Sequence, residues 1–158
     1  MREYVVTCCS TADMSRTFME TNEVPFAMFH YQLDGKEYAD DLYSSISPEV
    51  FYKMIGDGAQ PVTSQVNAEA YCALFEPVLK SGKDVLHLTL SSGISGSINS
   101  ANVAKTQMEE KYPDRRVMVV DSLAASSGYG MLVEQTLENQ RAGMSLEENA
   151  AWIVACLL

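Results

Sequence analysis

Serine and glycine residues that could bind an anion cluster within residues 85–101. An apolar run is followed there by Ser91, Ser92, Gly93, Ser95, Gly96 and Ser97, and residues of helical spacing come next. This order predicts a strand, a tight loop and a helix N-terminus. The first turn of a helix carries unpartnered N–H groups and the positive end of the helix dipole, and glycine lets a ligand approach the backbone. The stretch therefore predicts an anion site, with simple helix capping by the serines as the alternative.

Two other loops place a serine after an apolar strand. Ser10 follows a predicted strand at residues 4–7, and with Asp13 it resembles a capping box for a helix that reaches Met19. Ser122 follows a predicted strand at residues 117–120. Strands that are apolar on both faces and separated by helices predict an α/β fold with an open, mostly parallel sheet flanked by helices on both faces. We expect the three serine loops to converge at the carboxyl ends of these strands, where such sheets bind ligands.

The remaining elements are predicted from turns, caps and apolar periodicity. Residues 24–33 form a strand, Asp34-Gly35 a hairpin turn, and Ser47-Pro48 the start of a helix with an apolar face that ends at residues 56–58. Residues 61–65 form a polar loop between helices, and Asn67 caps the next helix. A capping box of Ser145 and Glu148 begins the last helix.

Size and charge limit the classes of partner. The 158 residues suit one domain, with 47% hydrophobic and 20% charged residues, and the net charge of −10 argues against nucleic acid and polyphosphate. No apolar run is long enough for a bilayer, and we expect the first residues to be a strand and not a signal peptide. The four cysteines form neither a metal pattern nor a disulfide framework, so we expect reduced thiols, a cytoplasmic location and no metal or cofactor.

Catalysis is poorly supported by the motifs. The loop lacks the lysine of a P-loop, and the G-x-x-G of Gly93 and Gly96 is not a dinucleotide motif. The segment from Gly93 to Ser97 nearly matches the nucleophile elbow G-x-S-x-G, but both histidines, His30 and His87, precede Ser95, whereas a hydrolase of that type needs a later one. We expect His87 to be a core residue and the pairs Asp40-Asp41 and Glu109-Glu110 to be solvated. The site is therefore predicted to bind and not to react.

Four motifs together resemble the DegV family. They are S-T-A-D at residues 10–13, P-V-T-S-Q at 61–65, L-S-S-G-I-S-G-S-I-N-S-A at 90–101 and V-V-D-S-L-A-A-S-S-G-Y-G-M-L at 119–132. They occur in family order and extend over most of the chain. The resemblance implies a bacterial fatty-acid-binding protein that holds one fatty acid between two domains. It also implies that the protein presents the carboxylate to a fatty-acid kinase, which makes an acyl phosphate for phospholipid synthesis, and that it is not itself an enzyme.

The resemblance also assigns the ligand-binding residues. The threonine of T-S-Q falls on Thr63 and the serine before the second glycine falls on Ser95, and these two would hydrogen-bond the carboxylate. Ser64, Gly96 and Ser97 would line the same pocket, and the loop hydroxyl of Ser92 completes the predicted set. A carboxylate needs a few oriented donors and little net positive charge, which agrees with the residues present.

The chain departs from the family pattern in two places. Cys9 stands where the family has an aspartate, and the family's C-terminal domain has no counterpart, so residues 1–158 are expected to be an N-terminal α/β domain. We expect this domain to bind long-chain fatty acids weakly and to form a homodimer through apolar surface. A serine hydrolase using Ser95 and a non-catalytic interaction domain remain the alternatives.

Overall fold

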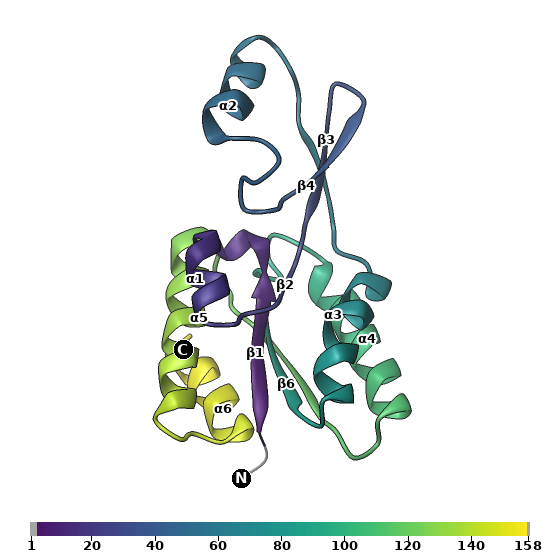
Figure 1. The fold of residues 1–158 in the computed structure, drawn as a ribbon, viewed down its shortest axis with the longest axis vertical. Coiled ribbons are helices and arrows are strands. Elements are labelled where there is room, and N and C mark those ends of the chain that lie inside the picture. Colours follow the sequence, from purple (N-terminus) through teal and green to yellow (C-terminus); the bar gives the residue numbers. More distant parts are fainter. Residues whose placement is uncertain (1–2, 158) are drawn as a thin grey trace.

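The computed structural model describes residues 3–157 as two units. A four-stranded parallel sheet with the order β2-β1-β6-β7 forms the larger unit, and an antiparallel sheet with the order β4-β3-β5 forms the smaller one. Helices cover both faces of the parallel sheet, while the smaller unit stands beyond the carboxyl ends of β1 and β6 (Figure 1). The predicted parallel α/β fold is confirmed, and the smaller unit is an addition to it.

Apolar residues explain the central position of β6. All six residues of β6 (Asp84–Thr89) are buried, and its neighbours β1 (Tyr4–Cys9) and β7 (Val117–Asp121) pair with it in parallel. The short β2 (Phe26–Ala27) extends the sheet beyond β1. A strand buried on both faces needs helices on both sides. These are α3 (Ala68–Lys80) and α4 (Ser97–Lys111) on one face, with α1 (Arg16–Thr21), α5 (Ser126–Arg141) and α6 (Leu146–Cys156) on the other (Figure 1).

Local capping signals predicted three helix starts correctly. Ser47 caps α2 (Pro48–Gly56), Asn67 caps α3, and Ser145 forms a full capping box with Glu148 at α6. The predicted capping box at Ser10 is wrong. Residues Ser10–Ala12 form a 3-10 turn (η1), Asp13 adopts a left-handed conformation, and α1 begins only after its own cap, Ser15.

The smaller unit consists of β3 (His30–Leu33), β4 (Lys36–Ala39), α2 and β5 (Val62–Ser64). The Asp34-Gly35 hairpin is confirmed, and both residues have the positive φ that a two-residue turn requires. The single strand predicted at residues 24–33 is wrong, because β2 joins the parallel sheet and β3 the antiparallel one. The predicted loop at 61–65 is also wrong, since Thr63 lies opposite Tyr31 in a ladder with β3.

Helix α2 contributes little to the core. None of its residues is buried, and Val50 on its predicted apolar face is 50% exposed. Phe51 makes the main inward contact, with its ring edge-on to Tyr31. No helix within residues 3–157 is long and apolar enough to cross a membrane.

Candidate functional site

The loop between β6 and α4 folds around Ser91. Its carbonyl oxygen accepts the N–H groups of Ile94 and Ser95, and its Oγ accepts the N–H of Gly93. Asp121, at the end of β7, fixes the loop from the side by accepting the N–H groups of Ser92 and Leu123 at 3.1 Å and 3.0 Å. The loop is therefore ordered by its own backbone and by one carboxylate from the neighbouring strand.

The two serines at the start of α4 are nearly or fully buried. Ser95 is 9% exposed, and its Oγ accepts the N–H of Ser97 at 3.2 Å. Ser97 is fully buried, and its hydroxyl has no hydrogen-bond partner of good geometry among the described residues, although the Tyr71 hydroxyl lies near it. No side chain caps α4, because Gly96 occupies the N-cap position. A buried hydroxyl without a partner at a helix N-terminus is suited to binding a ligand.

Strand β5 brings the T-S-Q motif next to this loop. A Cβ atom at Gly96 would lie only 2.9 Å from Oε1 and 3.1 Å from Nε2 of Gln65, so the Gln65 amide packs directly on the glycine. Thr63, two residues earlier, lines a cavity, while Ser64 is exposed and donates to the carbonyl oxygen of His30. Gln65 was missed as a candidate, although the motif contained it.

The other two serine loops do not offer free hydroxyls. Ser10 accepts the N–H of Phe29, and Ser122 both donates to and accepts from the backbone of Ala124. These loops lie at the expected edge of the sheet, but the Ser122 hydroxyl serves the backbone, and the Ser10 hydroxyl bonds both to the backbone and to the Asp40 carboxyl. The hydroxyls of Ser10 and Ser122 are therefore already engaged within the protein.

Below the loops a buried polar network joins the strand ends. The Tyr129 hydroxyl accepts the N–H of Cys9 and donates to the carbonyl oxygen of Leu88. The Cys9 thiol lies 3.4 Å from the Tyr71 hydroxyl and 3.8 Å from Nε2 of His87. Burial raises the pKa of the Cys9 thiol, which keeps it neutral and unreactive.

His87 is a core residue, as predicted. It is fully buried, its Nδ1 faces the Thr7 hydroxyl at 2.9 Å, and burial lowers its pKa to about 3. Its two ring nitrogens thus face Thr7 and Cys9, and no hydrogen bond joins it to Ser95 within residues 3–157. The Ser–His pair of a hydrolase is not formed by these residues.

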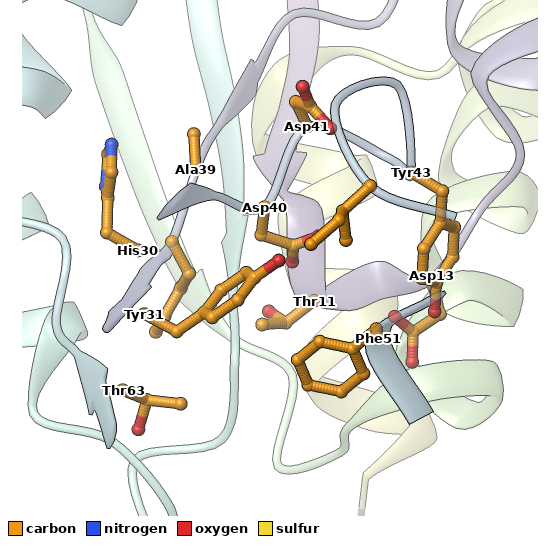
Figure 2. Close-up of a pocket in the computed structure, with 12 residues that line it drawn as sticks. Thr11, Asp13, His30, Tyr31, Ala39, Asp40, Asp41, Tyr43, Phe51 and Thr63 are labelled. Carbon is orange, nitrogen blue, oxygen red and sulfur yellow. The ribbon is translucent and has the colours of Figure 1, made fainter. Parts of the chain in front are cut away.

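A cavity of about 210 Å³ opens between the η1 turn and the smaller unit (Figure 2). Thr63 is the one predicted site residue in its wall. The other walls come from η1 and from β3, β4, α2 and the loop between them. Asp40 and Asp41 also line it, so the expectation that both are solvated is wrong for the half-buried Asp40. Ser64, Ser92, Ser95, Gly96 and Ser97 are not among the lining residues of this cavity.

Comparisons with known proteins agree on one family. The family model described as "Uncharacterised protein, DegV family" matches residues 5–156. A DegV domain-containing protein of Clostridium perfringens is 33% identical over 153 residues, which cover 97% of this chain and 53% of that protein. The chain thus spans about half the length of the curated relatives it matches.

Solved structures show the same fold. A DegV family protein from Thermus thermophilus, described by its fatty acid binding, has a TM-score of 0.85 and 31% identity, covering 98% of this chain and 53% of that one. A stearic-acid-binding protein from Eubacterium ventriosum has a TM-score of 0.86 and 28% identity, covering 96% and 52%.

Proposed function

The chain belongs to the DegV family, and on that premise we propose that it binds a long-chain fatty acid without transforming it. In this proposal Thr63 and Ser95 donate hydrogen bonds to the carboxylate. Ser64, Ser92, Gly96 and Ser97 line the surrounding pocket. The description of two similar structures as fatty-acid-binding proteins supports the choice of ligand.

The contact between Gln65 and Gly96 carries the assignment of the site. It packs the T-S-Q motif of β5 against the loop that holds Ser95, although 30 residues separate them in the chain. The buried hydroxyl of Ser97, which has the Tyr71 hydroxyl as its neighbour, lies at the same helix N-terminus. A carboxylate placed there gains from oriented N–H and O–H donors and from the helix dipole, without a lysine or arginine.

The proposal extends to the use of the bound acid. We propose presentation of the carboxylate to a fatty-acid kinase in the cytoplasm of a bacterium, as the family resemblance implies. The ligand site would then have to leave one carboxylate oxygen accessible. We also propose that residues 1–158 form the N-terminal α/β domain of this architecture, that they bind the acid weakly on their own, and that they self-associate through exposed apolar residues such as Val154.

Calorimetry with delipidated protein and oleate tests this function. Thr63→Ala and Ser95→Ala should each weaken binding by about tenfold, the effect of losing one hydrogen bond to a charged group. Thr106→Ala is the matched control, because Thr106 is exposed on α4 and bonds only to the Asn102 carbonyl oxygen of its own helix. Equal affinity of all four proteins would refute the assigned carboxylate site.

A second pair of variants tests the role of the glycine contact. Gly96→Ala forces the Gln65 amide to move, since 2.9 Å is too short for a Cβ contact. It should therefore weaken binding of oleate. Combining it with Gln65→Ala removes the clash and should restore part of the affinity. A double variant no better than Gly96→Ala alone would show that the contact does not hold the two loops in register.

A further inference from the structure

Aromatic rings and carboxylates together surround the 210 Å³ cavity between η1 and the smaller unit. The rings of Tyr31, Tyr43 and Phe51 and the carboxylates of Asp13 and Asp40 lie around one space (Figure 2). Phe29 adds a fourth ring and Asp41 a third acidic residue to the lining. The lining contains no lysine or arginine. His30 is the one histidine of the lining. Aromatic faces and carboxylates both attract cations, so most of the polar and aromatic wall favours a positive charge.

Neighbouring groups show that the cavity is electrically negative. Burial raises the pKa of the Asp40 carboxyl, a bond to Ser10 opposes this, and the charges of Asp13 and Asp41 raise it further. Burial also raises the pKa of the Tyr43 hydroxyl, and Asp13 and Asp40 add to that rise. Burial is the largest cause of both upward pKa shifts, and the neighbouring carboxylates add to it. A bound cation would offset that part of each shift that comes from the carboxylates.

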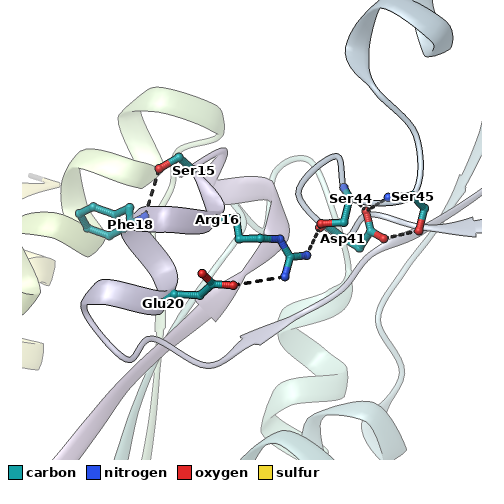
Figure 3. A network of polar contacts seen from close by, with 7 residues as sticks. All are labelled: Ser15, Arg16, Phe18, Glu20, Asp41, Ser44 and Ser45. Atoms are coloured by element: carbon teal, nitrogen blue, oxygen red, sulfur yellow. Dashed lines mark hydrogen bonds and ion pairs between the residues drawn. The ribbon is translucent and has the colours of Figure 1, made fainter.

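Arg16, near the rim of the cavity, is already engaged by protein groups. Arg16 donates to the carbonyl oxygen of Asp41 at 2.7 Å and pairs with Glu20 on its own helix (Figure 3). The Asp41 carboxylate accepts the N–H groups of Ser44 and Ser45. Burial raises the pKa of the Asp41 carboxyl, but a bond from the Ser45 hydroxyl, the two N–H bonds and the charge of Arg16 together lower it below its usual value. The rim is thus held in place with its negative charge intact.

We propose that this cavity binds a small organic ammonium ion, such as a quaternary ammonium of the size of choline. The volume is several times the ~30 Å³ of one water molecule, so an organic ion can enter. A metal ion fits less well, because no three acidic, histidine or cysteine side chains within residues 3–157 converge on a metal position. The aromatic walls would add nothing to a hydrated metal ion, whereas they stabilise an alkylammonium directly.

The cavity shares one residue, Thr63, with the proposed carboxylate site. Ser64, Ser92, Ser95, Gly96 and Ser97 lie outside its lining. The buried Oγ1 of Thr11, which has no hydrogen-bond partner among the described residues, is a further polar atom in the cavity wall. Choline titration and oleate titration therefore test the two proposals separately, with Thr63 as the shared residue.

Choline and its uncharged isostere 3,3-dimethylbutan-1-ol provide the test. Each is titrated into the purified 158-residue chain at constant ionic strength, and the ring signals of the four lining aromatic residues are followed by NMR. Choline should shift these signals and saturate with a dissociation constant of about 1 mM or lower, and the isostere should bind at least tenfold more weakly. Equal binding of the two compounds would make this a plain apolar pocket and overturn the proposal, as would the absence of saturable shifts.

Charge and ring variants sharpen the result. Asp40→Asn keeps the shape and removes one charge, and it should weaken choline binding by about tenfold. Asp34→Asn is the matched control, because Asp34 lies in the hairpin turn outside the lining and Asn tolerates its positive φ. Phe51→Leu removes a ring but not the apolar volume, and should weaken choline more than the isostere. Choline affinity unchanged in both Asp40→Asn and Phe51→Leu would refute the assignment.

Discussion

Replacing Tyr129 with phenylalanine removes one hydroxyl that joins two central strands. Tyr129 is fully buried on α5, and its hydroxyl accepts the N–H of Cys9 at the end of β1 and donates to the carbonyl oxygen of Leu88 in β6. The phenylalanine ring fills the same space, so no cavity forms and the apolar contacts of the ring are kept. The variant therefore isolates the two hydrogen bonds.

The expected cost follows from what the two backbone groups lose. A buried donor or acceptor left without a partner costs about 1–3 kcal/mol. The N–H of Cys9 loses its acceptor outright, whereas the Leu88 carbonyl keeps a second lone pair and is penalised less. We therefore expect Tyr129→Phe to lower the free energy of unfolding by about 2–4 kcal/mol, a large fraction of the stability of a domain this size.

Urea unfolding followed by circular dichroism measures this loss. The midpoint should fall while the slope of the transition stays constant, because the folded and unfolded surfaces are unchanged. Tyr52→Phe is the control: Tyr52 is 66% exposed on α2, and the change should stay within about 0.5 kcal/mol. A Tyr129→Phe variant as stable as the Tyr52→Phe control would refute the view that this hydroxyl holds the strand ends together.

Two further predictions concern stability. His87 has a pKa of about 3 in the folded chain and of 6.5 in the unfolded chain. Between these pH values the unfolded chain binds one proton that the folded chain does not. The free energy of unfolding should therefore decrease as pH falls from about 6.5 to 3, by at most ~1.4 kcal/mol per pH unit. His87→Gln should flatten that slope in urea midpoints measured across this range. The Asn149 side chain donates to the Tyr4 hydroxyl and to the Thr136 carbonyl oxygen, and it accepts from Asn139. Asn149→Ala should therefore lower the free energy of unfolding, measured by thermal unfolding, by about 2–3 kcal/mol. A decrease of less than about 1 kcal/mol would contradict this role.

Local signals explain what the sequence predicted correctly. The mainly apolar run that forms β6, the Asp34-Gly35 turn and the caps at Asn67 and Ser145 depend on residues within a few positions of each other. Such patterns can be predicted from sequence because the hydrogen bonds and the periodicity at these sites involve neighbouring residues only. The failure at Ser10 has a similar local explanation, since Ser15 offered an equally good cap five residues later.

Long-range pairings explain what the sequence did not predict. Strand β5 is polar and exposed, and it is a strand because Thr63 pairs with Tyr31 of β3, 32 residues away. The bond between Cys9 and Tyr129 spans 120 residues. The acidic cavity likewise needs residues from η1, β3, β4 and α2. No pattern within a short window contains these contacts, so only the folded chain reveals them.

The position of the smaller unit has a consequence for how the chain closes. Residues 28–66 connect β2 to α3, which both belong to the parallel unit. Because β2 and α3 are in contact, this segment begins and ends at neighbouring positions. Pairing β1 with β6 closes a loop of 80 residues, and about half of that loop is the smaller unit. Because the entropic cost of loop closure grows with the logarithm of loop length, the doubling of the loop by residues 28–66 adds only ~0.6 kcal/mol to the cost of pairing β1 with β6. The length of this segment can therefore change with little effect on the closure cost of the parallel sheet.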